Sequence, residues 1–171
     1  MKILGFQSGH DVSYCILENG IPIIHEELER FIRKKEPIGD GLDMAFQRIS
    51  DNELNEITHI CYGNPGRRTG KCGLKKSEEK LKSLNVDYSI IGHHQSHAAN
   101  AFFSSNFNEA LVITLDGSGV EKSNYKDYSK DCYTLKGNSE YFLSSCTFWL
   151  GKDLNIEPIE RIPTSKLTIG S

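Results

Sequence analysis

The chain has 171 residues, of which 37% are hydrophobic and 25% are charged. These proportions are those of an ordinary globular domain, and they exclude a disordered chain, a collagen and a disulfide scaffold. The chain has 20 Lys and Arg residues and 23 Asp and Glu residues. It therefore lacks the excess of positive charge that binds a phosphate backbone, and general nucleic-acid binding is not expected.

The apolar runs and the cysteines indicate the cellular setting. The longest apolar runs, Ile21–Ile24 and Leu111–Leu115, are far shorter than the ~20 residues that a membrane-spanning helix needs. The N-terminus lacks the apolar core of a signal peptide. Five cysteines, an odd number at scattered spacings, favour free thiols in a reducing compartment. We therefore expect a cytoplasmic protein with a single domain over residues 1–171 and no contact with a membrane.

The first part of the chain predicts a β-hairpin meander. Lys2–Phe6 and Val12–Glu18 are rich in β-forming residues. Asn19-Gly20 follows directly and favours a tight hairpin turn, because both residues tolerate positive φ. Ile21–His25 is then the returning strand, and the charged segment Glu26–Pro37 predicts a short helix or an ordered loop.

The remainder of the chain predicts alternating helices and strands. Helices are expected over residues 41–49, 74–84 and 93–103. A further short helix is expected to begin at a capping box at Ser50. Strands are expected at 57–62, 86–91, 110–115, 132–135 and 141–147, with a loop over 63–73. This order predicts an α/β fold, with a mixed sheet that begins as an N-terminal hairpin meander and is covered by helices on both faces.

Three of the six histidines fall within five residues, at His93, His94 and His97. On a helix, His93 and His97 are i and i+4 and share one face, so both imidazoles can reach one metal ion. His94 points about 100° away and is free for another role, such as donating to an anion. The alternative is a solvated, histidine-rich helix start, because this spacing also occurs by chance. The zinc-protease motif His-Glu-x-x-His has a Glu as its general base after the first histidine. Position 94 is His instead, so the match to that motif is weak.

Glycine-bearing polar turns are expected after two strands, at Ser8–Asp11 and at Asp116–Gly119. Such turns commonly hold phosphates in α/β sheets, because successive backbone N–H groups can point at an anion. His10 and Asp11 lie in the first of these turns, where their side chains can contact polar groups of a bound ligand. Asp116 can act as a metal ligand, and two His with one Asp is a known non-haem Fe(II) pattern. Plain turns are the alternative at both places.

A basic group follows the hairpin, and it consists of Arg30, Arg33, Lys34 and Lys35. Guanidinium and ammonium groups in such a run can grip a phosphate. Glu26, Glu27 and Glu29 lie beside them, so a solvated charged face is the alternative.

Taken together, four stretches resemble the N-terminal part of the nodulation-protein/antibiotic O-carbamoyltransferase family. They are MKILGFQSGHDVSYCILENGIPI, EELERFIRKK, IGHHQSHAANAFFSSNF and EALVITLDGSG, in the family's order. The similarity covers residues 1–120 and is vague from 120 to 171. It implies the first lobe of an actin/sugar-kinase/heat-shock ATPase-like fold, similar to the tRNA threonylcarbamoyladenosine transferase subunit. In that fold the two glycine-bearing turns are phosphate loops, the second of them containing Gly117, Ser118 and Gly119.

The resemblance also implies residue roles and a reaction. By it, Fe²⁺ or another divalent ion would be held by His93, His97 and Asp116. Carbamoyl or nucleotide groups would be contacted by His10, Asp11 and His94, with help from Arg30 and Lys34. The family forms carbamoyl-adenylate from ATP and carbamoyl phosphate in a separate C-terminal domain. It then passes the carbamoyl group to a hydroxyl of a small-molecule or sugar acceptor.

Members of that family are several times longer than this chain. We therefore expect an N-terminal fragment, or part of a split or truncated gene, which is inactive alone. We expect Tyr141–Leu150 to pair with a second copy or with a missing C-terminal half, the alternative being that this segment packs inside its own lobe. Two other functions remain open: a non-catalytic remnant or assembly module of this fold, and an ATP-binding lobe of a kinase-like protein, which would not need the paired histidines.

Overall fold

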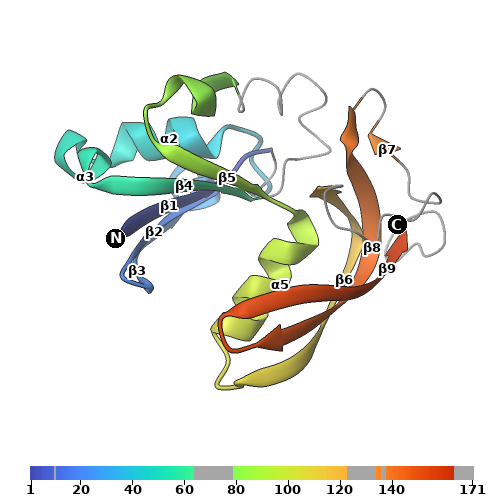
Figure 1. Ribbon diagram of the computed structural model, residues 1–171. Coiled ribbons are helices and arrows are strands. Elements are labelled where there is room, and N and C mark those ends of the chain that lie inside the picture. The colour runs from blue at the N-terminus through green and yellow to red at the C-terminus, as the bar shows by residue number, and fades with distance from the viewer. Residues whose placement is uncertain (10, 64–78, 123–133, 136–137, 164–171) are drawn as a thin grey trace. The chain divides into compact units, whose positions relative to one another are not determined.

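The computed structural model describes residues 1–9, 11–63, 79–122, 134–135 and 138–163. The chain divides into two compact units, Met1–Ile90 and Ile91–Ser171, and each is treated by itself below (Figure 1). The single domain over residues 1–171 stays a prediction. Within the described ranges, no helix combines the length and the apolar character needed to cross a membrane.

The first unit is built on a five-stranded mixed sheet with the strand order β3-β2-β1-β4-β5. Its strands are β1 Lys2–Gln7, β2 Ser13–Glu18, β3 Ile21–Glu27, β4 Ile57–Gly63 and β5 Asp87–Ile91. Strand β1 pairs antiparallel with β2 and parallel with β4. The predicted meander is confirmed, including its tight turn, where φ is 50° at Asn19 and 85° at Gly20.

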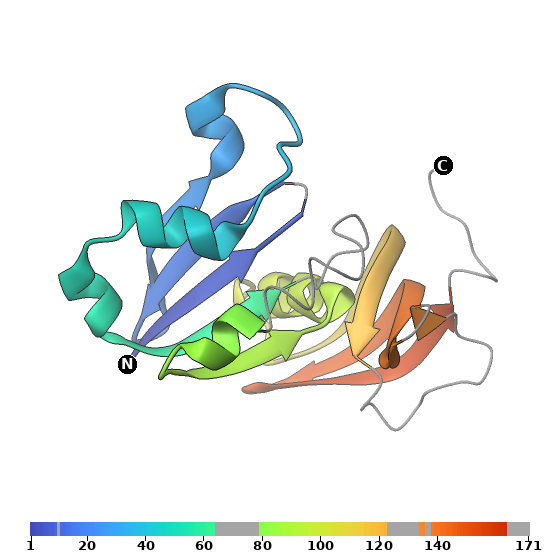
Figure 2. The same cartoon turned by 90° about the horizontal axis from the view of Figure 1, so that it is seen from above.

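Three short helices follow the meander: α1 Leu28–Ile32, α2 Gly41–Arg48 and α3 Asp51–Asn55. Helix α2 packs on β1 and β2 (Figure 2). The predicted cap at Ser50 is confirmed, because its hydroxyl accepts from the N–H of Glu53 while the Glu53 carboxylate accepts from the N–H of Ser50. The buried core of this unit includes Leu4, Phe6, Ile16, Leu42 and Ala45. Residues 79–83 are helical, and the start of the predicted helix at 74–84 lies outside the described residues, as does most of the predicted loop at 63–73.

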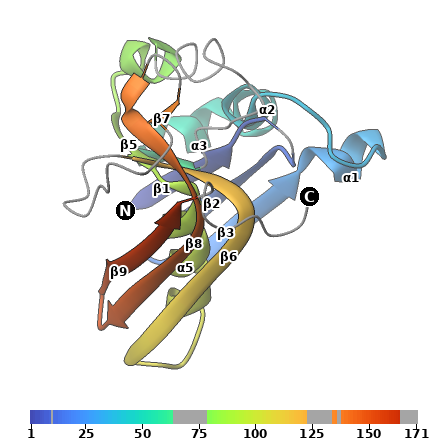
Figure 3. The ribbon, with the colours of Figure 1, turned by 90° about the vertical axis from the view of Figure 1, so that its right-hand side faces the viewer.

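The second unit combines α5 His93–Phe103 with an antiparallel sheet (Figure 3). The strands are β6 Glu109–Lys122, β7 Thr134–Leu135, β8 Asn138–Lys152 and β9 Asn155–Pro163. Strand β8 pairs with β6, β7 and β9, and α5 packs on β6 and β8. The α/β class and the mixed sheet are thus present. The expectation of one sheet is corrected, because the strands after α5 form a second sheet.

Strand β9 was not predicted from the sequence. It carries Pro158 and Pro163, and proline argues against a central strand. It pairs along one side of β8, and edge strands tolerate proline because one row of their N–H groups has no partner in the sheet. The tertiary position of the segment therefore outweighs its weak β-propensity.

The only tryptophan lies on β8 and is fully buried. Its indole N–H donates to Oγ1 of Thr114 at 3.1 Å, so Trp149 belongs to the core between the sheet and α5. The opposite sheet face exposes four large apolar side chains: Leu111, Ile113, Leu115 and Leu150. Pairing of Tyr141–Leu150 with a partner stays a prediction.

A hydrogen-bonded tyrosine in the first unit gives a prediction about stability at high pH. The buried Tyr14 hydroxyl donates to Glu26 Oε2 at 2.5 Å, and Arg48 pairs with the same carboxylate. Burial, and then the Glu26 carboxylate, raise the pKa of Tyr14 from 10.0 to about 12. Because the folded protein holds this proton more tightly than the unfolded chain, the stabilisation is complete below pH 10 and is lost as the pH rises toward 12.

We therefore expect Tyr14→Phe to lower the free energy of unfolding by about 1–2 kcal/mol at pH 8. The variant should also lose less stability than the parent between pH 9 and pH 11. Urea unfolding at the three pH values checks both effects, with Tyr88→Phe on β5 as the control. Parallel pH profiles for Tyr14→Phe and the parent would contradict the assigned hydrogen bond.

Candidate metal centre

Two histidines lie one turn apart at the start of α5. The helix begins at His93 after Gly92, and the Ser96 N–H donates to the Gly92 carbonyl at 2.9 Å. The observed bounds match the predicted range of 93–103. His93 and His97 therefore project from the same side of the helix, as residues at i and i+4 do.

Asp116 reaches these histidines from a bulge in β6. The ladder pairs Leu115 with Cys146 and next pairs Gly119 with Ser144, so residues 116–118 stand opposite one residue of β8. A bulge of this kind bends the strand and re-aims its side chains. The expected turn at Asp116–Gly119 is thereby corrected, because the strand runs on through these residues to Lys122.

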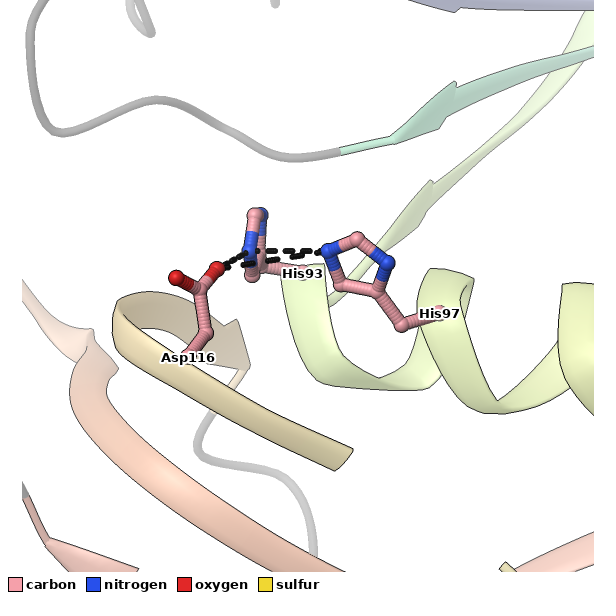
Figure 4. A group of neighbouring side chains, drawn as sticks. All are labelled: His93, His97 and Asp116. Atoms are coloured by element: carbon pink, nitrogen blue, oxygen red, sulfur yellow. Dashed lines mark hydrogen bonds and ion pairs between the residues drawn. The ribbon is translucent and has the colours of Figure 1, made fainter. Parts of the chain in front are cut away.

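The three side chains converge at one point (Figure 4). The His93 Nε2 is hydrogen-bonded to Asp116 Oδ2. The His97 Nε2 lies 3.1 Å from the His93 Nε2 and 4.0 Å from Asp116 Oδ2. All the ligand atoms lie within 4.8 Å of one another. The expected convergence is therefore present, whereas an ion held by the group stays a prediction.

The donor set fits a divalent transition metal. Ligands at about 2.0–2.2 Å from one ion lie roughly 3–4 Å from each other, and the separations of the His97 Nε2 from its two neighbours, 3.1 and 4.0 Å, fall in that range. Two imidazoles and one carboxylate, with further positions open, form a donor set that both Fe²⁺ and Zn²⁺ accept. His93 Nε2 and Asp116 Oδ2 are in direct hydrogen bond, so these two atoms must separate for an ion to lie between them.

The exposure and charge of the cluster also suit a cation. Side-chain exposure rises from 13% at His93 to 40% at Asp116 and 58% at His97, so the cluster is open at the His97 side. Burial raises the pKa of Asp116, but the hydrogen bond with His93, the two histidine charges and the Gly117 N–H together hold this pKa below 3.8. The Gly117 N–H donates to Asp116 Oδ1 at 2.6 Å. The carboxylate is therefore ionised and oriented at neutral pH.

His94 has a different environment from its neighbours. Its ring is fully buried, with Nδ1 3.0 Å from Oγ1 of Thr147 on β8. Burial, and then the charge of His93, lower the pKa of His94 to about 3, so the imidazole is neutral at pH 7. In this structure His94 fixes the start of α5 to β8, and its contact with a carbamoyl or nucleotide group stays a prediction.

Gly119 has a role that the sequence did not reveal. A Cβ atom at this position would lie 2.5 Å from Cδ2 of His93 and 2.6 Å from Cδ2 of His94. Real Cβ atoms essentially never approach so closely, so the absence of a side chain lets both rings lie against the bulge. From the sequence this glycine was assigned to a phosphate turn, and no single-sequence pattern distinguishes these two uses.

We expect Gly119→Ala to lower the affinity for a divalent metal by about 10–100-fold although every ligand is retained. The added methyl group must displace His93 or His94. Calorimetric titration with Mn²⁺ or Co²⁺ measures the loss. Gly39→Ala is the matched control, because its methyl group would meet Leu28 and Val12 at an ordinary 3.4 Å. Equal affinity in the two variants would show that Gly119 does not shape the site.

Three of the other predicted site residues, Asp11, Arg30 and Lys34, lie in the first unit. Asp11 is exposed and has a φ of 54°. Arg30 is exposed and forms ion pairs with Glu27 and Glu29. Lys34 is exposed as well. Both observations agree with the alternative that this basic group is a solvated charged face. His10 lies outside the described residues, and nothing is described of the Ser118 side chain.

Gly117, which was also predicted to hold phosphate, makes contacts within the bulge. Its N–H donates to Asp116, and its carbonyl accepts from the Ser145 hydroxyl at 3.2 Å. Phosphate binding by the predicted loop residues stays a prediction.

Comparison with known proteins finds two curated relatives. The uncharacterized protein MJ1051 of Methanocaldococcus jannaschii is 32% identical over 120 residues, which cover 68% of this chain and 22% of that protein. The uncharacterized protein sll1178 of Synechocystis is 29% identical over 126 residues, which cover 63% of this chain and 18% of that protein. The chain thus spans about a fifth of the length of these relatives. No family model matches the chain.

Proposed function

We propose that this chain is part of an O-carbamoyltransferase and carries the metal-binding lobe of its transfer domain. The observation that carries the proposal is the convergence of His93, His97 and Asp116 on one point. The motifs HHxxHA and DGxG supply these ligands, in the order found in the family that the sequence resembles. The proposed fold is correspondingly the first lobe of an actin/sugar-kinase/heat-shock ATPase-like domain.

In the proposed reaction, a hydroxyl of the acceptor attacks the carbonyl carbon of carbamoyl-adenylate. A new carbon–oxygen bond forms, the bond from that carbon to AMP breaks, and a base takes the hydroxyl proton. When bound, Fe²⁺ would supply a Lewis acid that polarises the carbamoyl carbonyl. ATP and carbamoyl phosphate are the proposed sources of the adenylate.

The residues of the chain would contribute by positioning. Asp116 is fixed by the Gly117 N–H on one side and by His93 on the other. The more exposed His97 lies on the open side of the cluster, where a substrate can approach. The neutral, buried His94 fixes α5 to β8. Because β8 is paired with β6, the helix and the strand that supply the ligands are held together.

The proposal is tested with a stable sulfamate analogue of carbamoyl-adenylate and Mn²⁺ as a paramagnetic ion. If both bind at the cluster, Mn²⁺ should broaden the proton NMR signals of the analogue in the presence of the chain. The broadening should disappear in His93→Ala and in Asp116→Ala, and it should persist in His59→Ala, a control in the first unit.

Three other outcomes would contradict the proposal in different ways. Metal binding without analogue binding would favour a non-catalytic remnant or assembly module. Binding of ATP that does not depend on His93 would favour an ATP-binding lobe of a kinase-like protein. Broadening that is equal in all variants would place the analogue elsewhere on the chain.

A further inference from the structure

A chain of buried hydroxyl groups leads from His94 into the second sheet. The Nδ1 of His94 lies 3.0 Å from the Thr147 Oγ1, and this oxygen lies 3.3 Å from the Ser144 Oγ. Both hydroxyl-bearing residues are on β8, and all three side chains are fully buried. Their polar atoms must therefore be satisfied by one another or by nearby backbone groups, because they are out of contact with bulk water.

The far end of this chain of hydroxyl groups fixes the direction in which its protons point. The Ser144 hydroxyl donates to the Cys146 carbonyl at 3.0 Å and to the Ile162 carbonyl at 3.3 Å. A hydroxyl has one proton, and a carbonyl can only accept. Ser144 thus uses its proton on the carbonyls and can only accept from Thr147. The Thr147 proton then points to Ser144, so Thr147 can only accept from His94.

The number of hydrogen bonds favours this direction over its reverse. With a proton on the His94 Nδ1, three hydrogen bonds form: from Nδ1 to Thr147, from Thr147 to Ser144, and from Ser144 to a carbonyl. If Nδ1 were bare, Thr147 would donate to it. Ser144 would then either turn away from both carbonyls or face the Thr147 oxygen with no proton between them. One of the three hydrogen bonds is lost in either case, and a buried hydrogen bond that is lost has no replacement from water.

A charged residue on β9 supports the same arrangement of protons. Arg161 lies directly opposite Thr147 in the β8–β9 ladder, so its side chain projects from the sheet face that carries the Thr147 hydroxyl. Its guanidinium carbon lies 5.1 Å from the centroid of the Trp149 ring, on that face. Burial is the main cause of the low pKa of His94, and the positive charge of Arg161 contributes to it. Because an arginine side chain has only donors, a bare Nε2 is better matched to this surrounding than a protonated one.

We propose that Ser144, acting through Thr147, holds the proton of His94 on Nδ1 and leaves Nε2 as a hydrogen-bond acceptor. Ser144 and Thr147 are then positioning residues, which lock the ring in one tautomer and one orientation at the start of α5. The Nε2 of the neutral ring can accept from an N–H or O–H group and cannot donate to an anion. This inference goes beyond the proposed function, since it concerns the protons of the chain without metal or substrate.

The parent chain, labelled with nitrogen-15 in its histidines, provides the first test. Long-range proton–nitrogen correlation spectra at pH 7 distinguish the two ring nitrogens, because a bare nitrogen resonates at higher frequency than a protonated one. His94→Gln identifies the signals that belong to this ring. The expected result is a protonated Nδ1 and a bare Nε2. A bare Nδ1, or protons on both nitrogens at pH 7, overturns the proposal.

Variants of β8 test the role assigned to Ser144. Ser144→Ala removes the acceptor of the Thr147 proton, which can then turn toward His94. The ratio of the Nδ1–H to the Nε2–H tautomer should fall by about 3–10-fold, as expected for the loss of one hydrogen bond. Ser145→Ala is the matched control, because Ser145 is equally buried on the same strand but donates to the Gly117 carbonyl. Its ratio should equal that of the parent.

The outcomes of these variants separate the assigned role from a general loss of packing. An unchanged ratio in folded Ser144→Ala, or equal changes in Ser144→Ala and Ser145→Ala, overturns the role of Ser144. Thr147→Val removes the acceptor of the Nδ1 proton and should shift the ratio in the same direction, so it provides the test if Ser144→Ala does not fold. The readout needs neither metal nor the carbamoyl-adenylate analogue, so it stands apart from the test of the proposed function.

Discussion

Replacing His93 with alanine is expected to lower the affinity of the chain for Fe²⁺, Mn²⁺ or Co²⁺ by about 100-fold or more. His93 lies at the centre of the cluster, since its Nε2 is hydrogen-bonded to Asp116 and is 3.1 Å from the His97 Nε2. Its removal takes away one ligand and also the hydrogen bond that orients Asp116 Oδ2. Calorimetric titration under anaerobic conditions measures the loss.

The matched control for this prediction is His59→Ala. His59 is also a half-buried histidine with a side-chain hydrogen bond, in this case to Ser89, but it belongs to the first unit. We expect its metal affinity to equal that of the parent. Thermal unfolding of both variants shows whether either has lost its fold, and equal affinities in the two folded variants would exclude His93 as a ligand.

Trp149→Ala is expected to lower the free energy of unfolding by about 3–5 kcal/mol. The side chain has 0% of its surface exposed, its N–H is bonded to Thr114, and the Arg161 guanidinium lies 5.1 Å from the ring centroid. Truncation therefore leaves a large cavity and removes a hydrogen bond and a cation–π contact together. Trp149→Phe refills most of the cavity and should restore about half of the loss.

Chemical denaturation followed by far-UV circular dichroism measures these differences, because the variants lack the tryptophan signal. Leu154→Ala is the control, since Leu154 is 92% exposed and its truncation should change stability by less than about 0.5 kcal/mol. A loss below about 1 kcal/mol in Trp149→Ala would mean that this part of the second unit is not packed as described.

Local patterns in the sequence predicted much of the fold. The turn at Asn19-Gly20, the cap at Ser50 and the helix over 93–103 were all found from local rules, because each depends on the conformational preference of a few adjacent residues. The division into two sheets and the strand at Asn155–Pro163 were not found. Both depend on pairing with β8, which no local preference encodes.

The candidate site shows the same division between local and tertiary information. The helical spacing of His93 and His97 is local, so their shared orientation was predictable. The bulge that brings Asp116 to them, and the open space at Gly119 that admits the His93 ring, arise where β6 meets α5 and β8. The burial of His94 against Thr147 was not predicted from the sequence, because the sheet on which a helix packs decides which of its side chains are buried.

X-ray absorption spectroscopy of the chain, loaded anaerobically with one equivalent of Fe²⁺, examines the metal centre itself. The geometry predicts a first shell of nitrogen and oxygen only, with the outer-shell scattering of two imidazole rings, and the loss of one ring in His97→Ala. The contradicting result is a spectrum without imidazole scattering, or one that is the same in the parent and in His97→Ala.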